Sequence, residues 1–272
     1  MARNRRITIQ LFGASADKQD VRLDDFIEQL NNVKKALRET ELAISGEDES
    51  AIDYKVVDLR HSSPSTIVLE AVSLNGHAGP KSFMPKVAES FASELSMIKR
   101  KGQLLIEPSL ARLHAYQEIG AKEKSRVQKV VIKLGRSTVT IDAKFKQKLS
   151  AIVGPDEFAE GTVSGMLEAL NFHNTNRFTL YPPLGPKKIA GTFPSSLRPK
   201  VKEAIGNFVT VSGKLKYKAW SPFPHGVIAE DVDIHEPDNE LPKLIDMRGA
   251  FAGSTGNLNS AEFIDYLRHE DW

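Results

Sequence analysis

The sequence predicts an α+β fold, in which an N-terminal α+β domain is followed by a small β-barrel and a helical tail. Three observations support this order. Strand and helix patterns alternate in the first half, short strands dominate the second half, and a final amphipathic segment follows a linker containing Gly, Ser and Asn. We place the three parts at residues 1–156, 157–237 and 238–272.

The first part is expected to have the order β-α-β-β-α-α-β-β-α. Two helices are predicted from apolar residues at spacings of three and four, which lie along one side of a helix. The two stripes are Phe26, Leu30, Val33, Leu37 and Val87, Phe91, Leu95, Ile98. Two further helices are expected over 107–116 and 143–152. Alternating or β-branched runs predict strands at 7–12, 52–56, 66–74, 127–134 and 137–141.

The second part reads as five strands with one helix between the third and the fourth. The strands are expected at 160–170, 177–181, 188–193, 207–219 and 226–235, and the helix at 195–205. Gly165 lies inside the first strand, where a glycine allows the sharp bend that closing a small barrel requires.

The order of these parts, with the run Ile205-Gly-Asn-Phe-Val-Thr-Val-Ser-Gly213, resembles small barrels of the OB type. The resemblance covers about 80 residues and concerns architecture. It implies a module that binds a ligand, and OB barrels commonly bind single-stranded nucleic acid.

The composition limits the class of protein. Hydrophobic residues make up 40% and charged residues 26% of the chain, as in a soluble globular protein. No run approaches the roughly 18 apolar residues of a membrane span. The strand pattern at Ile7–Phe12 follows the basic N-terminus directly, unlike a secretory signal peptide. The absence of cysteine excludes disulfides and thiolate metal sites, so we expect a cytoplasmic, bacterial protein.

Charge is distributed unevenly along the chain. Residues 236–272 contain eight acids and three bases, a net charge of −5, so residues 1–235 carry +7 of the total of +2. A basic body with an acidic tail suggests an anionic partner, or a tail that covers the body's own basic surface. The alternative is that these charges only keep the protein in solution.

The fourth barrel strand has a basic side. Alternation places Val209, Val211, Gly213, Leu215 and Tyr217 on one side of the strand, and Lys214, Lys216 and Lys218 on the other, next to Trp220. A nucleic-acid site would use these lysines for phosphates, with Trp220, Tyr181 or Phe178 stacking on bases. The alternative is that the lysines solvate the outer face and protect it from edge pairing.

The tail contains a helix signal. Asn259 and Glu262 have the spacing of a capping box, and Phe263, Ile264 and Leu267 form an apolar side. A helix of about ten residues is marginal alone and needs a surface on which to dock.

This segment resembles the toxin-binding tail of antitoxins that neutralise PIN-domain ribonucleases. Those tails also run hydrophobic-Arg-Gly, then Ser-x-Glu-Phe-hydrophobic, then Leu-Arg. In that family an arginine enters the toxin's acidic, metal-binding site, and the matching positions here are Arg248 and Arg268. The resemblance covers about 30 residues, and such antitoxins usually begin with a small DNA-binding domain, which this chain replaces with 235 other residues. The alternative is a tail that folds back over its own barrel.

No constellation of catalytic residues stands out. The seven histidines have no metal-protease or facial-triad spacing. Asp231, Asp233 and His235 alternate on one strand and could form only a weak metal site, whereas the run Asp58–Ser65 reads as a structural turn. We therefore expect no cofactor and no metal.

Our leading hypothesis is a non-enzymatic protein-interaction module that engages a protein partner, such as a PIN-type nuclease, through its tail. The alternatives are a single-stranded nucleic-acid binder and an enzyme with an unrecognised site.

Overall fold

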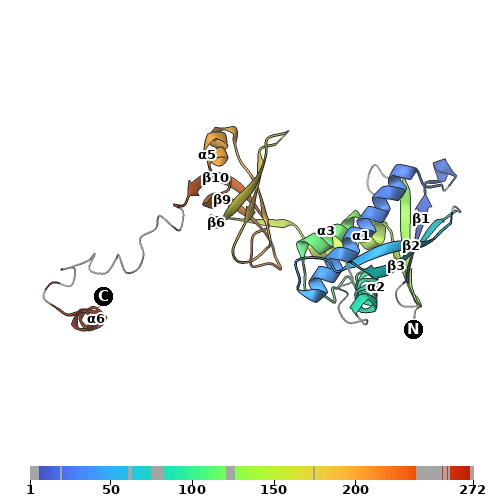
Figure 1. The fold of residues 1–272 in the computed structure, drawn as a ribbon, viewed down its shortest axis with the longest axis horizontal. Coiled ribbons are helices and arrows are strands. Elements are labelled where there is room, and N and C mark those ends of the chain that lie inside the picture. The colour runs from blue at the N-terminus through green and yellow to red at the C-terminus, as the bar shows by residue number, and fades with distance from the viewer. Residues whose placement is uncertain are drawn as a thin grey trace. The chain divides into compact units, whose positions relative to one another are not determined.

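The structure is a computed structural model that describes residues 6–18, 20–60, 63–74, 83–120, 126–173, 175–236, 253, 256 and 258–269. The chain divides into two compact units. The first contains Met1–Pro155 and Lys218–Trp220, and the second contains Asp156–Tyr217 and Ser221–Trp272. Helices and strands are both abundant, so the predicted α+β class is confirmed (Figure 1).

The first unit has the predicted order of strands and helices. Its elements are β1 (Arg6–Gly13), α1 (Leu23–Ser45), β2 (Ile52–Arg60), β3 (Ser65–Ser73), α2 (Phe83–Lys101), α3 (Leu110–Glu118), β4 (Val127–Leu134), β5 (Ser137–Ile141) and α4 (Ala143–Val153), with a short 3-10 turn at Ser15–Asp17. Helix α3 begins three residues later than predicted. The carbonyls of Ile106 and Glu107 instead accept hydrogen bonds from the Arg112 guanidinium, at 3.1 and 2.7 Å.

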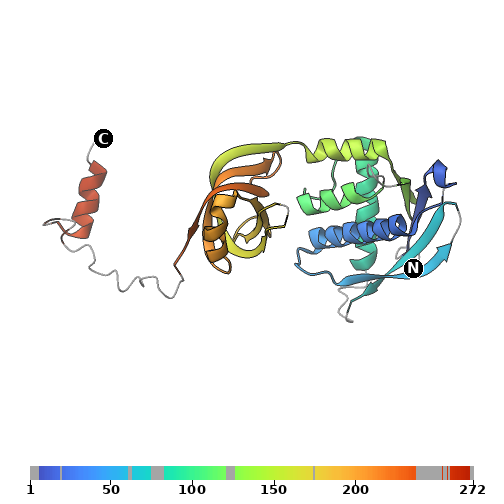
Figure 2. The same ribbon diagram turned by 90° about the horizontal axis from the view of Figure 1, so that it is seen from above.

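The five strands of the first unit form one antiparallel sheet in the order β2-β3-β1-β4-β5. Alternate residues of β1, Ile7, Ile9 and Leu11, are buried in the core of this unit, as a two-residue side-chain period requires. The helices of the unit lie beside the sheet (Figure 2). Both predicted helical stripes face this core. All four residues of the α2 stripe are buried, and in α1 Val33 and Leu37 are buried while Phe26 and Leu30 pack beside them.

The second unit contains a closed five-stranded barrel. Its elements are β6 (Asp156–Asn171), β7 (Arg177–Tyr181), β8 (Ile189–Thr192), η3 (Ser195–Leu197), α5 (Arg198–Glu203), β9 (Phe208–Lys218) and β10 (Gly226–Ile234). The strands are hydrogen-bonded in the order β10-β8-β7-β6-β9, and the pairing of β9 with β10 closes the ring. Strands β8 and β10 are parallel. The barrel has its own core, which includes Leu167, Leu180 and Val211.

Two glycines lie where barrel strands approach each other closely. A Cβ atom on Gly165 would meet the carbonyl oxygen of Tyr181 at 2.6 Å, and one on Gly213 would meet the carbonyl oxygen of Ile228 at 2.3 Å. Gly213 also has a φ of +145°, which side chains disfavour. Substitution at either position would therefore push two barrel strands apart.

The last described element is helix α6 (Ser260–His269), which confirms the predicted C-terminal helix. None of its residues is buried. Arg248, one of the two arginines predicted to contact a partner, lies outside the described residues. Among the described residues, no helix is both long enough and apolar enough to cross a membrane.

A buried polar cluster joins α2 and α3 in the first unit. Glu94 and Arg112 are both fully buried and form an ion pair at 3.3 Å, and the Tyr116 hydroxyl donates to the other Glu94 oxygen at 2.8 Å. Burial and the neighbouring carboxylate raise the pKa of Tyr116 well above its usual value. Among the described residues, Arg112 Nε and Nη1 have no hydrogen-bond partner, and the Glu94 carboxylate compensates the buried guanidinium charge.

We predict that Glu94→Ala lowers the free energy of unfolding of the first unit by about 3–5 kcal/mol, because it leaves the Arg112 charge buried without its partner. The matched control is Glu118→Ala, which removes an exposed pair with Lys35 and should cost less than about 1 kcal/mol. Urea unfolding followed by circular dichroism measures both variants. Equal effects would contradict this account of the cluster.

Candidate binding surfaces

A basic and aromatic surface lies on the outside of the barrel, and we call it the Phe158 face. It contains Phe158 at the start of β6, Lys214 and Lys216 on β9, and Ile228 opposite Lys214 on β10. The ammonium groups of Lys214 and Lys216 lie 5.6 and 6.0 Å from the Phe158 ring centroid. Phe158 is 51% exposed, so the face combines accessible aromatic surface with two cations.

Lys218 and Trp220 do not belong to this face, which corrects the prediction that they continue it. Lys218 is only 7% exposed, and its ammonium group donates to the Gly154 carbonyl at 2.8 Å. The Trp220 indole donates to the Val153 carbonyl at 3.3 Å and packs against the core of the first unit. The carbonyls at the end of a helix lack partners within the helix, so these side chains complete the end of α4.

The two other aromatic candidates also lie elsewhere. Phe178 is only 2% exposed and belongs to the barrel core, so it cannot stack on a base. Tyr181 is exposed but lies on β7 opposite Met166, eight residues along β6 from Phe158, or roughly 25 Å of extended strand. Tyr181 therefore remains an accessible aromatic residue without a link to the lysines.

Phe158 itself was missed from the sequence. The first barrel strand was expected to begin at residue 160, whereas β6 begins at Asp156. Its apolar ring among acidic neighbours was the signal available in the sequence. Glu160 is two residues after Phe158 and therefore on the same side of the strand. Its negative charge makes the net positive charge of the face lower than the two lysines alone would give.

The two aspartates of β10, Asp231 and Asp233, are paired with a lysine. Lys200 of α5 donates to Asp231 at 2.8 Å and to Asp233 at 3.4 Å, and this hydrogen bond holds the pKa of Asp231 below its usual value. The His235 ring interacts instead with the Thr210 hydroxyl at 2.7 Å. Among the described residues, no cluster of three or more potential ligands could hold a metal ion.

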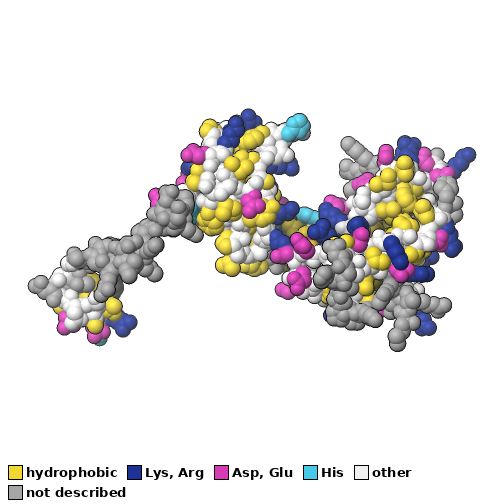
Figure 3. Space-filling model, in the orientation of Figure 1, with side chains coloured by type: hydrophobic (Ala, Val, Ile, Leu, Met, Phe, Trp, Pro, Cys, Tyr) yellow, Lys and Arg dark blue, Asp and Glu magenta, His cyan; other side chains and the backbone are white. Residues whose placement is uncertain are grey.

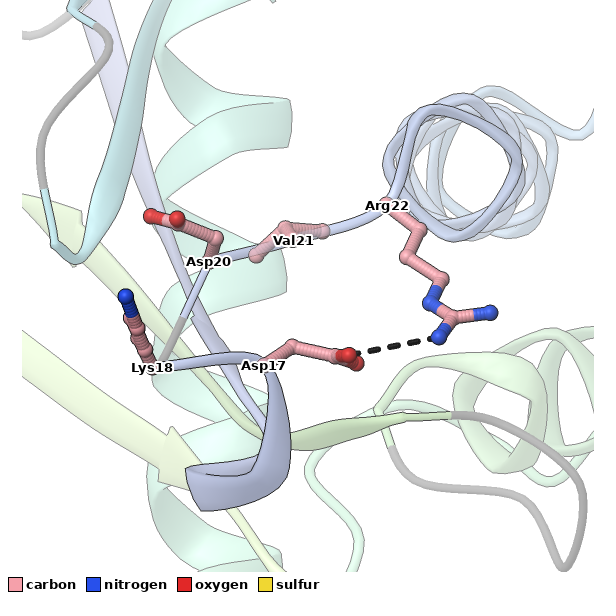
Figure 4. Close-up of a pocket in the computed structure, with 5 residues that line it drawn as sticks. All are labelled: Asp17, Lys18, Asp20, Val21 and Arg22. Atoms are coloured by element: carbon pink, nitrogen blue, oxygen red, sulfur yellow. Dashed lines mark hydrogen bonds and ion pairs between the residues drawn. The ribbon is translucent and has the colours of Figure 1, made fainter.

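A shallow pocket of about 350 Å³ lies between β1 and α1 and is lined by Asp17, Lys18, Asp20, Val21 and Arg22 (Figure 4). Asp17 accepts hydrogen bonds from Arg22 at 3.2 Å and from Arg126 at 3.0 Å, which lower its pKa. A carboxylate held ionised between two guanidinium groups is a poor proton donor or acceptor near neutral pH. The pocket therefore has the chemistry of a surface ion-pair cluster.

Helix α6 has a well-formed N-terminus and an accessible apolar side. The Asn259 side chain accepts from the amides of Ala261 and Glu262 at 3.0 Å, while Glu262 accepts from the Asn259 amide at 3.1 Å. This is the predicted capping box. Ile264 and Leu267 are 49% and 47% exposed, and Phe263 is partly buried. Arg268 is exposed in the last turn.

Comparison with protein-family models, curated proteins and solved structures finds no match to this chain.

We predict that Asn259→Ala weakens α6 by about 1 kcal/mol, because two amide groups lose their hydrogen-bond acceptor. Amide hydrogen exchange at residues 263–267 should become faster. Ser260→Ala, at the neighbouring exposed position, is the control and should leave exchange nearly unchanged. Equal exchange in the two variants would show that the cap does not support the helix.

Proposed function

We propose that the protein is a non-enzymatic, cytoplasmic interaction module that binds a protein partner through helix α6. The observation that carries this proposal is a capped amphipathic helix none of whose residues is buried. A helix of this length gains most of its stability from the surface on which its apolar side packs. The helix is therefore suited to docking in a groove of another molecule.

The chemistry of α6 indicates how it would be recognised. Ile264 and Leu267 are one turn apart, so they can enter adjacent apolar pockets of a groove. Arg268 follows Leu267 and offers a guanidinium group that can pair with carboxylates. A PIN-type nuclease with an acidic centre fits this pattern, and Arg248 would provide a second cation. This assignment rests on the resemblance of the tail to antitoxins.

The partner test uses the full-length chain and the PIN-domain ribonuclease encoded nearest to its gene. We expect the chain to bind and inhibit the nuclease. Ile264→Ser with Leu267→Ser should reduce inhibition at least about tenfold, and Arg268→Ala should also weaken it. Leu184→Ser is the matched control, because Leu184 is 81% exposed on the barrel and undergoes the same change. Unchanged inhibition by the α6 variants would refute the proposed role of the helix.

A second candidate function is binding of single-stranded nucleic acid by the barrel. Its support is the Phe158 face, where two lysines adjoin an exposed ring on a five-stranded closed barrel. Helix α5 lies between the third and fourth barrel strands, and this is consistent with the proposed OB-type architecture. Phosphates would contact the lysines, and a base would stack on Phe158.

For this second function we predict that Lys214→Gln with Lys216→Gln reduces affinity for a single-stranded oligonucleotide and flattens its salt dependence by about 1.4 in logarithmic slope. Phe158→Leu should weaken binding while leaving the slope unchanged. Lys86→Gln with Lys144→Gln, exposed in the first unit, gives the same net charge as a control. Binding that is insensitive to salt, or equal losses in both double variants, would eliminate this function.

A further inference from the structure

The sheet of the first unit has two unlike edges. Strand β5 is a short edge of five residues that packs against α2 and α4. The opposite edge, β2, has nine residues, and Val56, Val57 and Leu59 are 56%, 37% and 59% exposed. A long edge strand with accessible apolar side chains is a template for pairing with another strand.

Helix α1 extends this apolar surface. Lys34 of α1 forms an ion pair with Asp53 of β2 at 2.9 Å, which places the helix alongside the strand. Ile27 lies seven residues before Lys34 on the helix, and Val56 lies three residues after Asp53 on the strand. Each separation is about 10 Å, and both run in the same direction from the ion pair. Leu23, one turn before Ile27, is 71% exposed and Ile27 is 48% exposed. Hydrophobic side chains gather over α1 and β2 in Figure 3.

A β-bulge between Val56 and Asp58 determines which side chains share a face of β2. Lys55 pairs with Glu70 of β3 and Asp58 with Val68, and these two β3 residues are on the same side of their strand. Without the extra residue, Lys55 and Asp58 would point to opposite faces. The bulge therefore places both side chains on the outer face of the sheet.

This arrangement makes β2 complementary to itself. If two β2 strands run antiparallel about a twofold axis between Val56 and Val57, residue numbers in each opposing pair add to 113. The outer-face pairs then have opposite charges, and the inner-face pair is apolar: Lys55 with Asp58, Asp53 with Arg60, and Tyr54 with Leu59 of the second copy. Opposite charges directly across antiparallel strands are favourable.

We propose that the protein forms a homodimer by antiparallel pairing of β2, with Leu23 and Ile27 of α1 at the border of the interface. The pairing satisfies backbone groups at the β2 edge and covers its exposed valines. The existing pairs Lys55–Glu70, at 3.9 Å, Arg60–Asp58, at 2.8 Å, and Lys34–Asp53, at 2.9 Å, are exposed and cost little to rearrange. This surface shares no residue with α6 or with the Phe158 face, so it goes beyond the proposed function.

Sedimentation velocity of the full-length chain over a concentration series tests the dimer. Asp58→Lys should raise its dissociation constant about tenfold or more, because it places two lysines opposite each other at both symmetric positions. The double variant Lys55→Glu, Asp58→Lys reverses both charges and should recover most of the lost association. A monomeric chain at all concentrations, or a double variant no better than Asp58→Lys, would overturn the proposal.

A covalent crosslink gives a second test of the dimer. Because the chain has no cysteine, an introduced cysteine is its only thiol. In the proposed register the two Val56 Cα atoms are about 6 Å apart, from a strand spacing of 4.8 Å and an offset of one residue. Disulfides join Cα atoms roughly 4.4–6.8 Å apart. Val56→Cys should therefore oxidise to a linked dimer, whereas Thr138→Cys, exposed on the β5 edge, should not. Equal crosslinking of the two variants would overturn the proposed register.

Discussion

A helix of ten residues cannot bury enough of its own surface to be stable in water, so α6 needs another surface on which to pack. The sheet unit and the barrel each enclose a core, and α6 belongs to neither core. Its capping box satisfies amide groups at its first turn but buries no apolar side chain. The proposed partner would supply the surface that Ile264 and Leu267 lack among the described residues.

The sheet unit and the barrel are each stabilised by specific interactions of their own. Closure of the barrel depends on backbone contacts at Gly165 and Gly213, where no side chain fits. In the first unit, the buried Glu94–Arg112 pair fixes the loop before α3 through the carbonyls of residues 106 and 107. Both features stabilise the folds of their own units.

Periodic apolar patterns predicted much of the fold because they report burial directly. The stripe Val87, Phe91, Leu95 and Ile98 is buried as expected, and the hairpin strands β4 and β5 have their predicted bounds. Alternation failed for Lys218, because the same charge pattern suits either solvent or the carbonyl groups at a helix end. It also could not reveal the bulge in β2, since a bulge depends on pairing with β3 and leaves no mark on the local pattern. The capping box at Asn259 was predictable because all its partners lie within four residues.

Hydrogen exchange of the α6 amides in the full-length chain, with and without the PIN-domain ribonuclease encoded nearest to its gene, tests the central claim most directly. The account predicts rapid exchange at residues 263–267 in the chain alone, because the helix has no buried side, and strong protection in the complex. Amides that are equally protected without the nuclease, or that stay unprotected when it is added, would contradict the claim that α6 is the docking element.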